Sequence, residues 1–192
     1  MKDLPVSVSM PDPAFRSAPG SAIAFVPLAT IDGAAVEALL DRAFGPDRHA
    51  RTAYKVRGRA APIAALSLAA IEDGRLIGTI QCWPITLSGD DGTAYPLVMI
   101  GPVAVEPDRQ QDGVGRRLMT HALDAAAAHG LDTRLMLSGD PEYYARFFGF
   151  DAAHTAQWRL PGPVERHRLL ARGADVPDVA GMLGPAVAAA PA

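Results

Sequence analysis

The sequence of 192 residues contains a single cysteine, Cys82, so no disulfide can form within the chain. Scarce cysteine is typical of a reducing compartment, and we expect a cytoplasmic protein. The sequence also has no excess of positive charge, since 18 Lys and Arg against 21 Asp and Glu give a net charge of −3. That balance argues against general nucleic-acid binding, which depends on basic side chains that displace counterions from phosphates. No apolar run reaches the length of a membrane span, and residues 1–20 lack the hydrophobic block of a secretion signal, so neither nucleic acid nor membrane is expected as a partner.

The sequence also lacks histidines and cysteines at the spacing that a metal site requires. The five histidines are scattered along the chain and Cys82 has no second thiol, so we expect no metal site. Cys82 lies in an apolar segment with no base nearby in the sequence, which argues against a nucleophilic thiol.

The chain does contain enough apolar sequence for one ordinary core. Hydrophobic residues make up 49% and charged residues 20% of the chain, as in globular domains. Prolines keep residues 1–20 irregular, and we interpret them as a flexible leader. Residues 21–175 are expected to form a single domain. The Ala-, Pro- and Gly-rich residues 176–192 are expected to form a C-terminal tail whose last dozen residues are frayed.

Apolar periodicity predicts antiparallel strands first and then alternating strands and helices. A strand at 21–28 precedes a helix that begins after Thr30 or Asp32 and stops at Gly45. The further predicted strands are 66–71, 76–83, 95–107, 133–139, 157–160 and 166–173, and the further helices are 113–129 and a short aromatic one within 141–150. This order predicts an α+β fold with a mixed sheet and one crossover helix.

The pair Gly101-Pro102 interrupts the long apolar strand at 95–107. Proline cannot donate to a strand ladder, and glycine weakens a strand. The pair therefore predicts a bulge or a break in strand pairing.

The stretch PDRQQDGVGRRLM, residues 107–119, places two glycines at a helix start and two arginines, Arg116 and Arg117, directly after them. A helix start carries partial positive charge from its unpaired N–H groups, so arginines are unfavourable there unless an anion binds. Glycine lets the oxygens of an anion approach the backbone, which favours a phosphate site over the alternative, a turn with both arginines in solvent. A Walker loop would need Lys-Ser or Lys-Thr after its last glycine, and a dinucleotide fingerprint would need a glycine in place of Leu118, so both are excluded.

The remaining pattern, Gln110-x-x-Gly113-x-Gly115 after an apolar strand that ends in PVAVEP, resembles the acetyl-CoA pyrophosphate loop of the GNAT superfamily of N-acetyltransferases. That family's motif is Arg/Gln-x-x-Gly-x-Gly/Ala. The segments IGPVAVEPDRQQDGVGRRLM and LMLSGDPEYYARFFGF resemble its fourth strand to third helix and its fifth strand to fourth helix. The resemblance extends over residues 64–160 and is greatest to a branch with a GDPxYYxRFGF-like segment. It implies the GNAT fold, a mixed central sheet flanked by helices, whose fourth and fifth strands splay apart around acetyl-CoA as co-substrate.

The resemblance also implies roles for residues at matching positions. The pantetheine would pair with the backbone around Val103, Ala104 and Val105, and a backbone N–H near Val103 would stabilise the oxyanion. The pyrophosphate would bind the loop residues Gln110, Gln111, Asp112, Gly113, Val114, Gly115 and Arg116. The general acid for the departing thiolate would be Tyr144, with Tyr143 as second candidate. The family usually places this tyrosine one residue later, where this chain has Ala145.

No general base is assigned. The family often uses a carboxylate on the fourth strand, but residues 97–105 have no ionisable side chain and Glu106 comes too late. Asp140 and Glu142 could act directly or through water, although Asp140-Pro141 is a typical helix start. An amine that loses its proton to solvent needs no base.

The sequence thus predicts an enzyme that transfers an acetyl group from acetyl-CoA directly to a primary amine of a small molecule or peptide. The alternative is a non-catalytic acyl-CoA-binding sensor or assembly module, and a longer acyl or an aminoacyl donor is also open. The basic segment 48–59 is expected to be either a solvated surface or the rim of a site for an anionic ligand. A homodimer is compatible with the sequence.

Overall fold

An eight-stranded mixed sheet forms the centre of the protein in the computed structural model, which describes residues 22–186. The strands lie in the order β1-β2-β3-β4-β5-β7, while β8 pairs with the far half of β3 and β6 pairs with β8. The pairs β4–β5 and β6–β8 are parallel, so the prediction of a mixed sheet is confirmed. The predicted leader, residues 1–20, lies outside the described residues. The strands are β1 Ala24–Pro27, β2 Leu68–Glu72, β3 Arg75–Gly89, β4 Ala94–Val105, β5 Leu135–Ser138, β6 Trp158–Arg159, β7 Leu169–Arg172 and β8 Gly181–Pro185.

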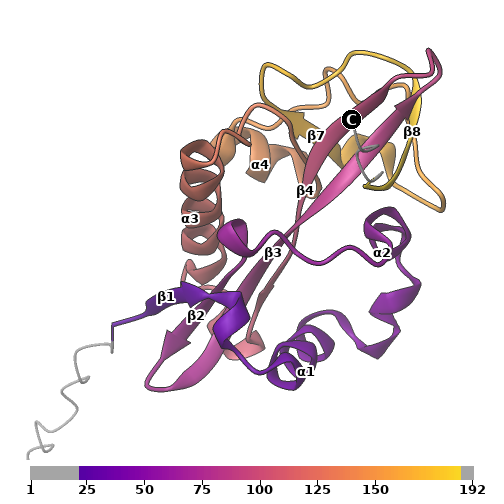
Figure 1. The fold of residues 1–192 in the computed structure, drawn as a ribbon. Helices are drawn as coiled ribbons and strands as arrows, with labels where there is room; N and C mark the ends of the chain where they lie inside the picture. Colours follow the sequence, from indigo (N-terminus) through magenta and orange to yellow (C-terminus); the bar gives the residue numbers. More distant parts are fainter. Residues whose placement is uncertain (1–21, 187–192) are drawn as a thin grey trace, which may run out of the picture.

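Helices cover both faces of this sheet (Figure 1). On one face lie α3 (Val114–Ala128), which links the parallel strands β4 and β5, and α4 (Pro141–Phe148); on the other lie α1 (Gly33–Phe44) and α2 (Thr52–Arg57). Three apolar clusters are buried against the sheet, one under α3 on the first face and two, under α1 and under α2, on the second. Among residues 22–186, no helix combines the length and the apolar character needed to cross a bilayer. Short 3-10 turns occur at Leu28–Thr30, Pro46–Ala50, Ala64–Leu66, Pro107–Arg109 and Arg166–Arg168.

Local sequence determines how the helices begin. Asp32 caps α1 and Asp140 caps α4, and each carboxylate accepts backbone N–H groups of the first turn at distances between 2.9 and 3.2 Å. By contrast, α3 follows Gly113, which has no side chain to cap it and a φ of +72°. The first turn of α3 therefore keeps backbone donors for an acceptor from outside the helix.

Strand β4 is interrupted where the sequence predicts it. Gly101 and Pro102, joined by a cis peptide bond, together lie opposite the single residue Gln81 of β3, which is the geometry of a β-bulge. On its other edge, β4 pairs with β5 only at Val98 and Met99, before the bulge. Beyond the bulge, no strand of residues 22–186 pairs with the β5-facing edge of β4.

The bulge also changes the direction in which backbone groups of β4 point. The N–H of Val98 donates toward β5, to the carbonyl of the residue that precedes that strand, at 2.9 Å. Backbone groups alternate between the two edges of a strand, so without an extra residue the even-numbered positions would continue to face β5. After the bulge, however, the N–H of Glu106 donates toward β3 at 2.9 Å. It follows that Val103 and Val105 direct their N–H and C=O groups away from β3, into the gap between β4 and β5.

The C-terminal segment joins the sheet, so the predicted frayed end is wrong for residues 181–185. These residues form β8, which pairs antiparallel with the last five residues of β3. Leu183 is fully buried, and Val176 is buried as well. A Cβ on Gly181 would lie 2.6 Å from the carbonyl oxygen of Ser88. Glycine is thus present here because two strands approach closely, and not because the segment lacks structure.

Candidate active site

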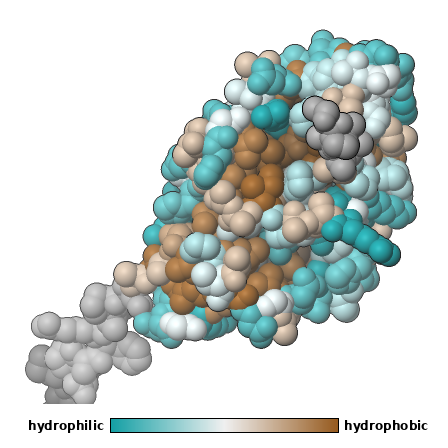
Figure 2. Space-filling view, in the orientation of Figure 1, coloured by the Kyte–Doolittle hydropathy of each residue, from teal (hydrophilic) through white to brown (hydrophobic). Residues whose placement is uncertain are grey.

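Two adjoining hollows lie where β4 and β5 separate. The wide pocket, of 720 Å³, is enclosed by the segment 44–57, the middle of β4, the end of β5 and residues 160–169. The narrow groove, of 500 Å³, extends from β4 past the start of α3 to α4. Phe44, Val103 and Tyr144 line both hollows and so mark their junction. Figure 2 shows hydrophobic side chains gathered in the middle of this face, between the α3–α4 side and the α1–α2 side.

The narrow groove brings together seven of the ten residues predicted to bind the co-substrate. Strand β4 contributes two of them, and the turn and first residues of α3 contribute the rest. The seven are Val103, Val105, Gln110, Gln111, Gly113, Gly115 and Arg116. The groove can therefore hold an extended ligand that lies along β4 and ends at the start of α3.

The other three predicted residues, Ala104, Asp112 and Val114, do not line the groove. Ala104 is fully buried in the apolar cluster under α1, and Val114 is fully buried in the cluster under α3. The carboxylate of Asp112 accepts from Arg109 at 2.5 Å, and the backbone N–H of Asp112 donates to the carbonyl of Arg109 at 3.2 Å. The side chains of all three are thus engaged within the protein.

The start of α3 directs backbone donors to one end of the groove. The N–H of Arg117 donates to the carbonyl of Gly113 at 3.1 Å, so the N–H groups of residues 114–116 precede the helical hydrogen-bond pattern. The left-handed φ of Gly113 is one that other residues adopt only at a cost. A Cβ on Gly115 would lie 3.5 Å from the Val105 side chain, an ordinary contact. The first glycine is therefore required by conformation, whereas the second leaves space in the groove.

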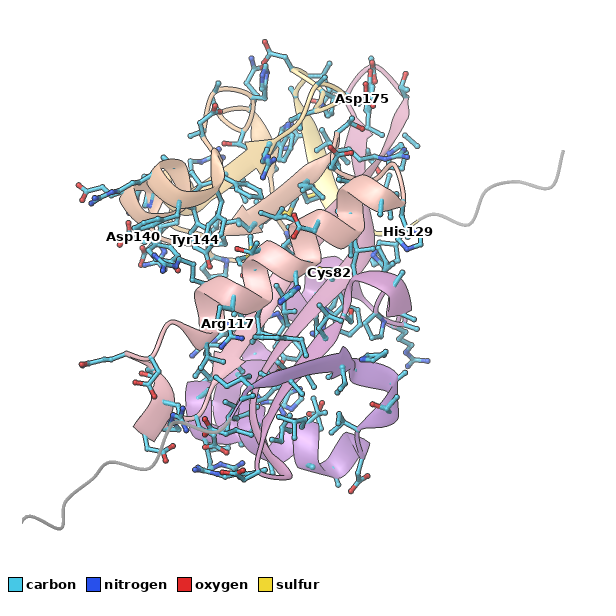
Figure 3. The ribbon with its side chains drawn as sticks, turned by 90° about the vertical axis from the view of Figure 1, so that its left-hand side faces the viewer. Cys82, Arg117, His129, Asp140, Tyr144 and Asp175 are labelled. Atoms are coloured by element: carbon cyan, nitrogen blue, oxygen red, sulfur yellow. The ribbon has the colours of Figure 1, made fainter. Side chains whose placement is uncertain are left out.

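The two arginines that follow these glycines lie in different surroundings. Arg116 lines the groove, with its Cζ 5.6 Å from the centroid of the Phe147 ring on α4. Arg117 lies over the ring of Phe25 at 4.7 Å and links α3 to β1, and Figure 3 shows it on the side of α3 that faces the viewer. Only Arg116 is therefore positioned to attract an anion in the groove, although the sequence suggested that both arginines would.

Tyr144 lies at the junction of the two hollows, whereas Tyr143 lines the groove but not the wide pocket. Figure 3 shows Tyr144 beside Asp140. Burial raises the pKa of the Tyr144 phenol above its usual value of 10.0, so the phenol stays protonated at neutral pH and can donate a proton. A Cβ on Gly139 would lie 2.1 Å from the Tyr144 ring, which means that Gly139 makes room for that ring. Of the two tyrosines, Tyr144 is the better placed for proton transfer between two bound molecules.

The carboxylates around the junction are already engaged. Asp140 lines the wide pocket, but its Oδ1 accepts two N–H groups of α4. Glu106 is 5% exposed and accepts from an arginine of α1 at 2.6 Å, and neither Glu106 nor Glu142 lines either hollow. Glu165 lines the wide pocket 3.7 Å from Arg168 and was not predicted from the sequence. No carboxylate of residues 22–186 is thus an unengaged base at the junction.

The basic segment 48–59 is neither a uniform solvated surface nor a continuous rim. Arg48 is 1% exposed and forms ion pairs with Glu37 and Asp41 of α1, so it is a structural residue. Arg57 is also buried, whereas Arg51 is exposed at the wide pocket. A 3-10 turn followed by the six-residue helix α2 gives neighbouring arginines different surroundings. The basic residues of this segment therefore do not share one regular helical face.

A long-range contact completes one wall of the wide pocket. The hydroxyl of Thr52 on α2 donates to the carbonyl of Pro163 at 2.6 Å. A Cβ on Gly162 would lie 2.6 Å from that hydroxyl, so glycine allows the close approach. The two partners are 111 residues apart, and no local pattern in the sequence predicted that residues 160–165 would form part of the site.

Metal ligands do not gather in the described part of the chain. Residues 22–186 contain no group of three or more His, Cys, Asp or Glu side chains that could hold a metal ion. His121 instead contacts the ring of Phe25, with the ring centroids 4.4 Å apart.

Cys82 is expected to resist thiol reagents in the folded protein. It is fully buried on the sheet beneath α3 (Figure 3), and burial raises the pKa of its thiol to about 12. Because the thiolate is the reactive form, treatment of the native protein with iodoacetamide near neutral pH should leave activity unchanged and add no label by mass spectrometry. Denatured protein should take up one label. Stoichiometric labelling before unfolding would contradict the burial of Cys82.

Comparison with known proteins gives consistent matches over most of the chain. The profile of the Acetyltransferase (GNAT) family matches residues 34–150. The protein named "Uncharacterized N-acetyltransferase YhbS" from Escherichia coli K12 is 33% identical over 135 residues, which cover 69% of this chain and 77% of that protein.

Solved structures agree with the sequence matches. The crystal structure of E. coli YhbS in complex with CoA aligns with a TM-score of 0.63 and 26% identity, over 91% of this chain and 92% of its own. A GNAT family acetyltransferase from Brucella melitensis in complex with acetyl-CoA has the same fold, with a TM-score of 0.60 and 24% identity over 83% of this chain and 94% of its own.

Proposed function

The chain belongs to the GNAT family of acetyltransferases, and from this premise we propose that it transfers the acetyl group of acetyl-CoA to a primary amine of a small molecule or peptide. The family establishes the enzyme class, an N-acetyltransferase. The observation that carries the finer proposal is the junction of the two hollows at Val103 and Tyr144. A donor in the groove and an acceptor in the pocket would meet there, beside the bulge of β4.

The narrow groove is the proposed site of the coenzyme. Val103 and Val105 direct backbone groups into the gap, where the amides of a pantetheine arm can take the place of a neighbouring strand. The pyrophosphate would then reach the N–H groups at the start of α3 and the guanidinium of Arg116. The crystal structure of YhbS, which is 26% identical to this chain, is a complex with CoA, and this supports binding of the coenzyme by this chain.

The proposed reaction is a direct attack in a ternary complex. The amine nitrogen forms a bond to the thioester carbonyl carbon, and the bond from that carbon to sulfur breaks. A backbone N–H near Val103 would stabilise the oxyanion, and Tyr144 would donate its phenolic proton to the departing thiolate. We assign no general base, because the carboxylates around the junction are engaged. The amine loses its proton to water, and water returns a proton to the Tyr144 phenolate before the next turnover.

Thiol release tests this proposal. The protein is incubated with acetyl-CoA and a broad panel of primary amines, and we expect amine-dependent release of CoA together with an acetylated acceptor in the mass spectrum. Reactions without amine supply the background, and parallel reactions with longer acyl-CoA donors test the choice of acyl group. If calorimetry shows tight CoA binding but no amine is acetylated, the protein is instead a non-catalytic acyl-CoA-binding sensor or assembly module.

A further inference from the structure

A buried arginine in the wide pocket has no carboxylate partner. Arg57 is 9% exposed and lines the pocket, and it forms no ion pair with any Asp or Glu of residues 22–186. Its Cζ lies 3.8 Å from the ring centroid of Tyr54 and 4.1 Å from that of Trp83. Its Nη1 donates to the side chain of Gln81 over a long 3.4 Å. Burial lowers the pKa of the Arg57 guanidinium, which means that the surroundings of this side chain disfavour a charge that arginine cannot lose at ordinary pH.

Of the other charged side chains of the wide pocket, Arg51 is exposed and donates to the carbonyl of Phe44 at 2.9 Å, and the rest have partners within the protein. Arg48 is paired with two carboxylates of α1. Arg168 lies 3.7 Å from Glu165, and Asp140 accepts the N–H groups of α4. Arg57 is therefore a deeply buried charge with no carboxylate of residues 22–186 within ion-pair distance, and Glu37, which is paired with Arg48, attracts it only from farther away.

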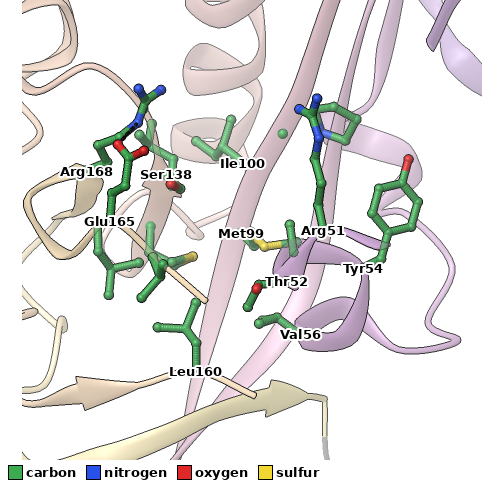
Figure 4. Close-up of a pocket in the computed structure, with 18 of the residues that line it drawn as sticks. Arg51, Thr52, Tyr54, Val56, Met99, Ile100, Ser138, Leu160, Glu165 and Arg168 are labelled. Carbon is green, nitrogen blue, oxygen red and sulfur yellow. Dashed lines mark ion pairs between the residues drawn. The ribbon is translucent and has the colours of Figure 1, made fainter. Parts of the chain in front are cut away.

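The position of Arg57 relates it to the proposed site of transfer. Gln81, which accepts from Arg57, is the residue of β3 opposite the bulge of β4. Figure 4 shows apolar side chains, among them Met99 and Leu160, in the middle of the pocket, with Arg168 on one side. The wide pocket thus combines an apolar interior with a buried cation near the point where β4 and β5 separate.

We propose that the acceptor carries a carboxylate as well as its amine, and that Arg57 binds this carboxylate in the wide pocket. The inference rests on the proposed function and names the chemical class of its acceptor, an amino acid with an apolar body. The rings of Tyr54 and Trp83 lie against the guanidinium, whose N–H groups would donate to the carboxylate. A planar carboxylate fits this fork with two parallel hydrogen bonds, which an amide or alcohol cannot match.

The first test measures binding without catalysis. With the protein saturated with CoA, calorimetry is used to titrate 4-phenylbutyrate, a carboxylate with an apolar body and no amine, and its carboxamide as the neutral match. We expect the carboxylate to bind about tenfold or more tightly than the amide, and Arg57→Met to remove the difference. Arg59→Met, at an exposed position outside the pocket, is the matched control. Equal binding of the two probes to the wild-type protein would overturn the inference. This comparison uses the wild-type protein alone and so does not depend on the folding of a variant.

The second test compares turnover of acceptors. Amino acids with increasing separation of amine and carboxylate are each assayed beside their carboxamides. We expect kcat/KM to favour the carboxylate by about tenfold or more at the preferred separation, Arg57→Met to abolish this preference, and Arg59→Met to retain it.

The two tests separate failure of the inference from failure of the proposed function. Acetylation of amines regardless of a carboxylate would overturn the inference alone. Selective carboxylate binding without acetylation of any amine would overturn the proposed reaction, while Arg57 would still be shown to bind carboxylates.

Discussion

Replacement of Gly113 by glutamate is expected to abolish acetyl-CoA binding while the protein still folds. Nothing lies within 4 Å of the position that a Cβ would take at Gly113, so a longer side chain can extend into the groove without a clash. Its carboxylate would then lie near the N–H groups where the pyrophosphate is proposed to bind. Repulsion between the two anions and the loss of these donors should weaken binding by about 100-fold or more in calorimetry.

Gly113→Gln is the matched control, because it has the same size and the same backbone strain without the charge. Any non-glycine residue at a φ of +72° costs about 1 kcal/mol, so both variants should unfold at similar, slightly lowered temperatures. We expect Gln to weaken binding much less than Glu. Unchanged affinity of the Glu variant for acetyl-CoA would remove the basis for placing the coenzyme in the narrow groove.

Replacement of Tyr144 by phenylalanine is expected to lower kcat by about 100-fold with little change in acetyl-CoA affinity. The ring still fills the space beside Gly139, so only the phenolic proton is lost. The pKa of Tyr144 lies above 10.0, so the wild-type rate should not fall through loss of this proton until the pH exceeds that value. The phenylalanine variant has no phenolic proton at position 144, so its slower rate should not fall at high pH through loss of such a proton.

Tyr143→Phe separates the two tyrosines, because Tyr143 lines the groove but not the junction. Its rate should stay close to that of the wild-type enzyme. If Tyr144→Phe leaves the rate unchanged at every pH while Tyr143→Phe lowers it, the acid is Tyr143. If neither substitution has an effect, the thiolate takes its proton from water.

Features that depend on neighbouring residues were predictable from the sequence. The bulge at Gly101-Pro102, the helix caps and the glycine turn before α3 follow from backbone properties of single residue types, and the structure confirms all three. The loop that lines the narrow groove was identified from its resemblance to the pyrophosphate loop of the GNAT family, and seven of the ten predicted residues line the groove. Which of the loop side chains turn inward was not predictable, because burial of Val114 and pairing of Asp112 depend on tertiary packing.

The wide pocket was the least predictable part. Its walls come from segments that meet only in the fold, such as Thr52 and Pro163, and the charge of Arg48 is balanced by two carboxylates on another helix. A run of arginines gives no indication in the sequence of which one is paired, exposed or unbalanced. Strand β8 was missed for a related reason, since small residues permit close packing as well as disorder.

The extra residue in β4 has a consequence for how this site can vary. The groups that face the gap at Val103 and Val105 belong to the main chain, so exchange of either side chain leaves them in place. Insertion or deletion of one residue between Pro102 and Glu106 would instead turn every carbonyl and amide of that stretch toward the opposite edge. Side-chain substitutions are thus tolerated in this stretch, whereas the insertion or deletion of a residue is not.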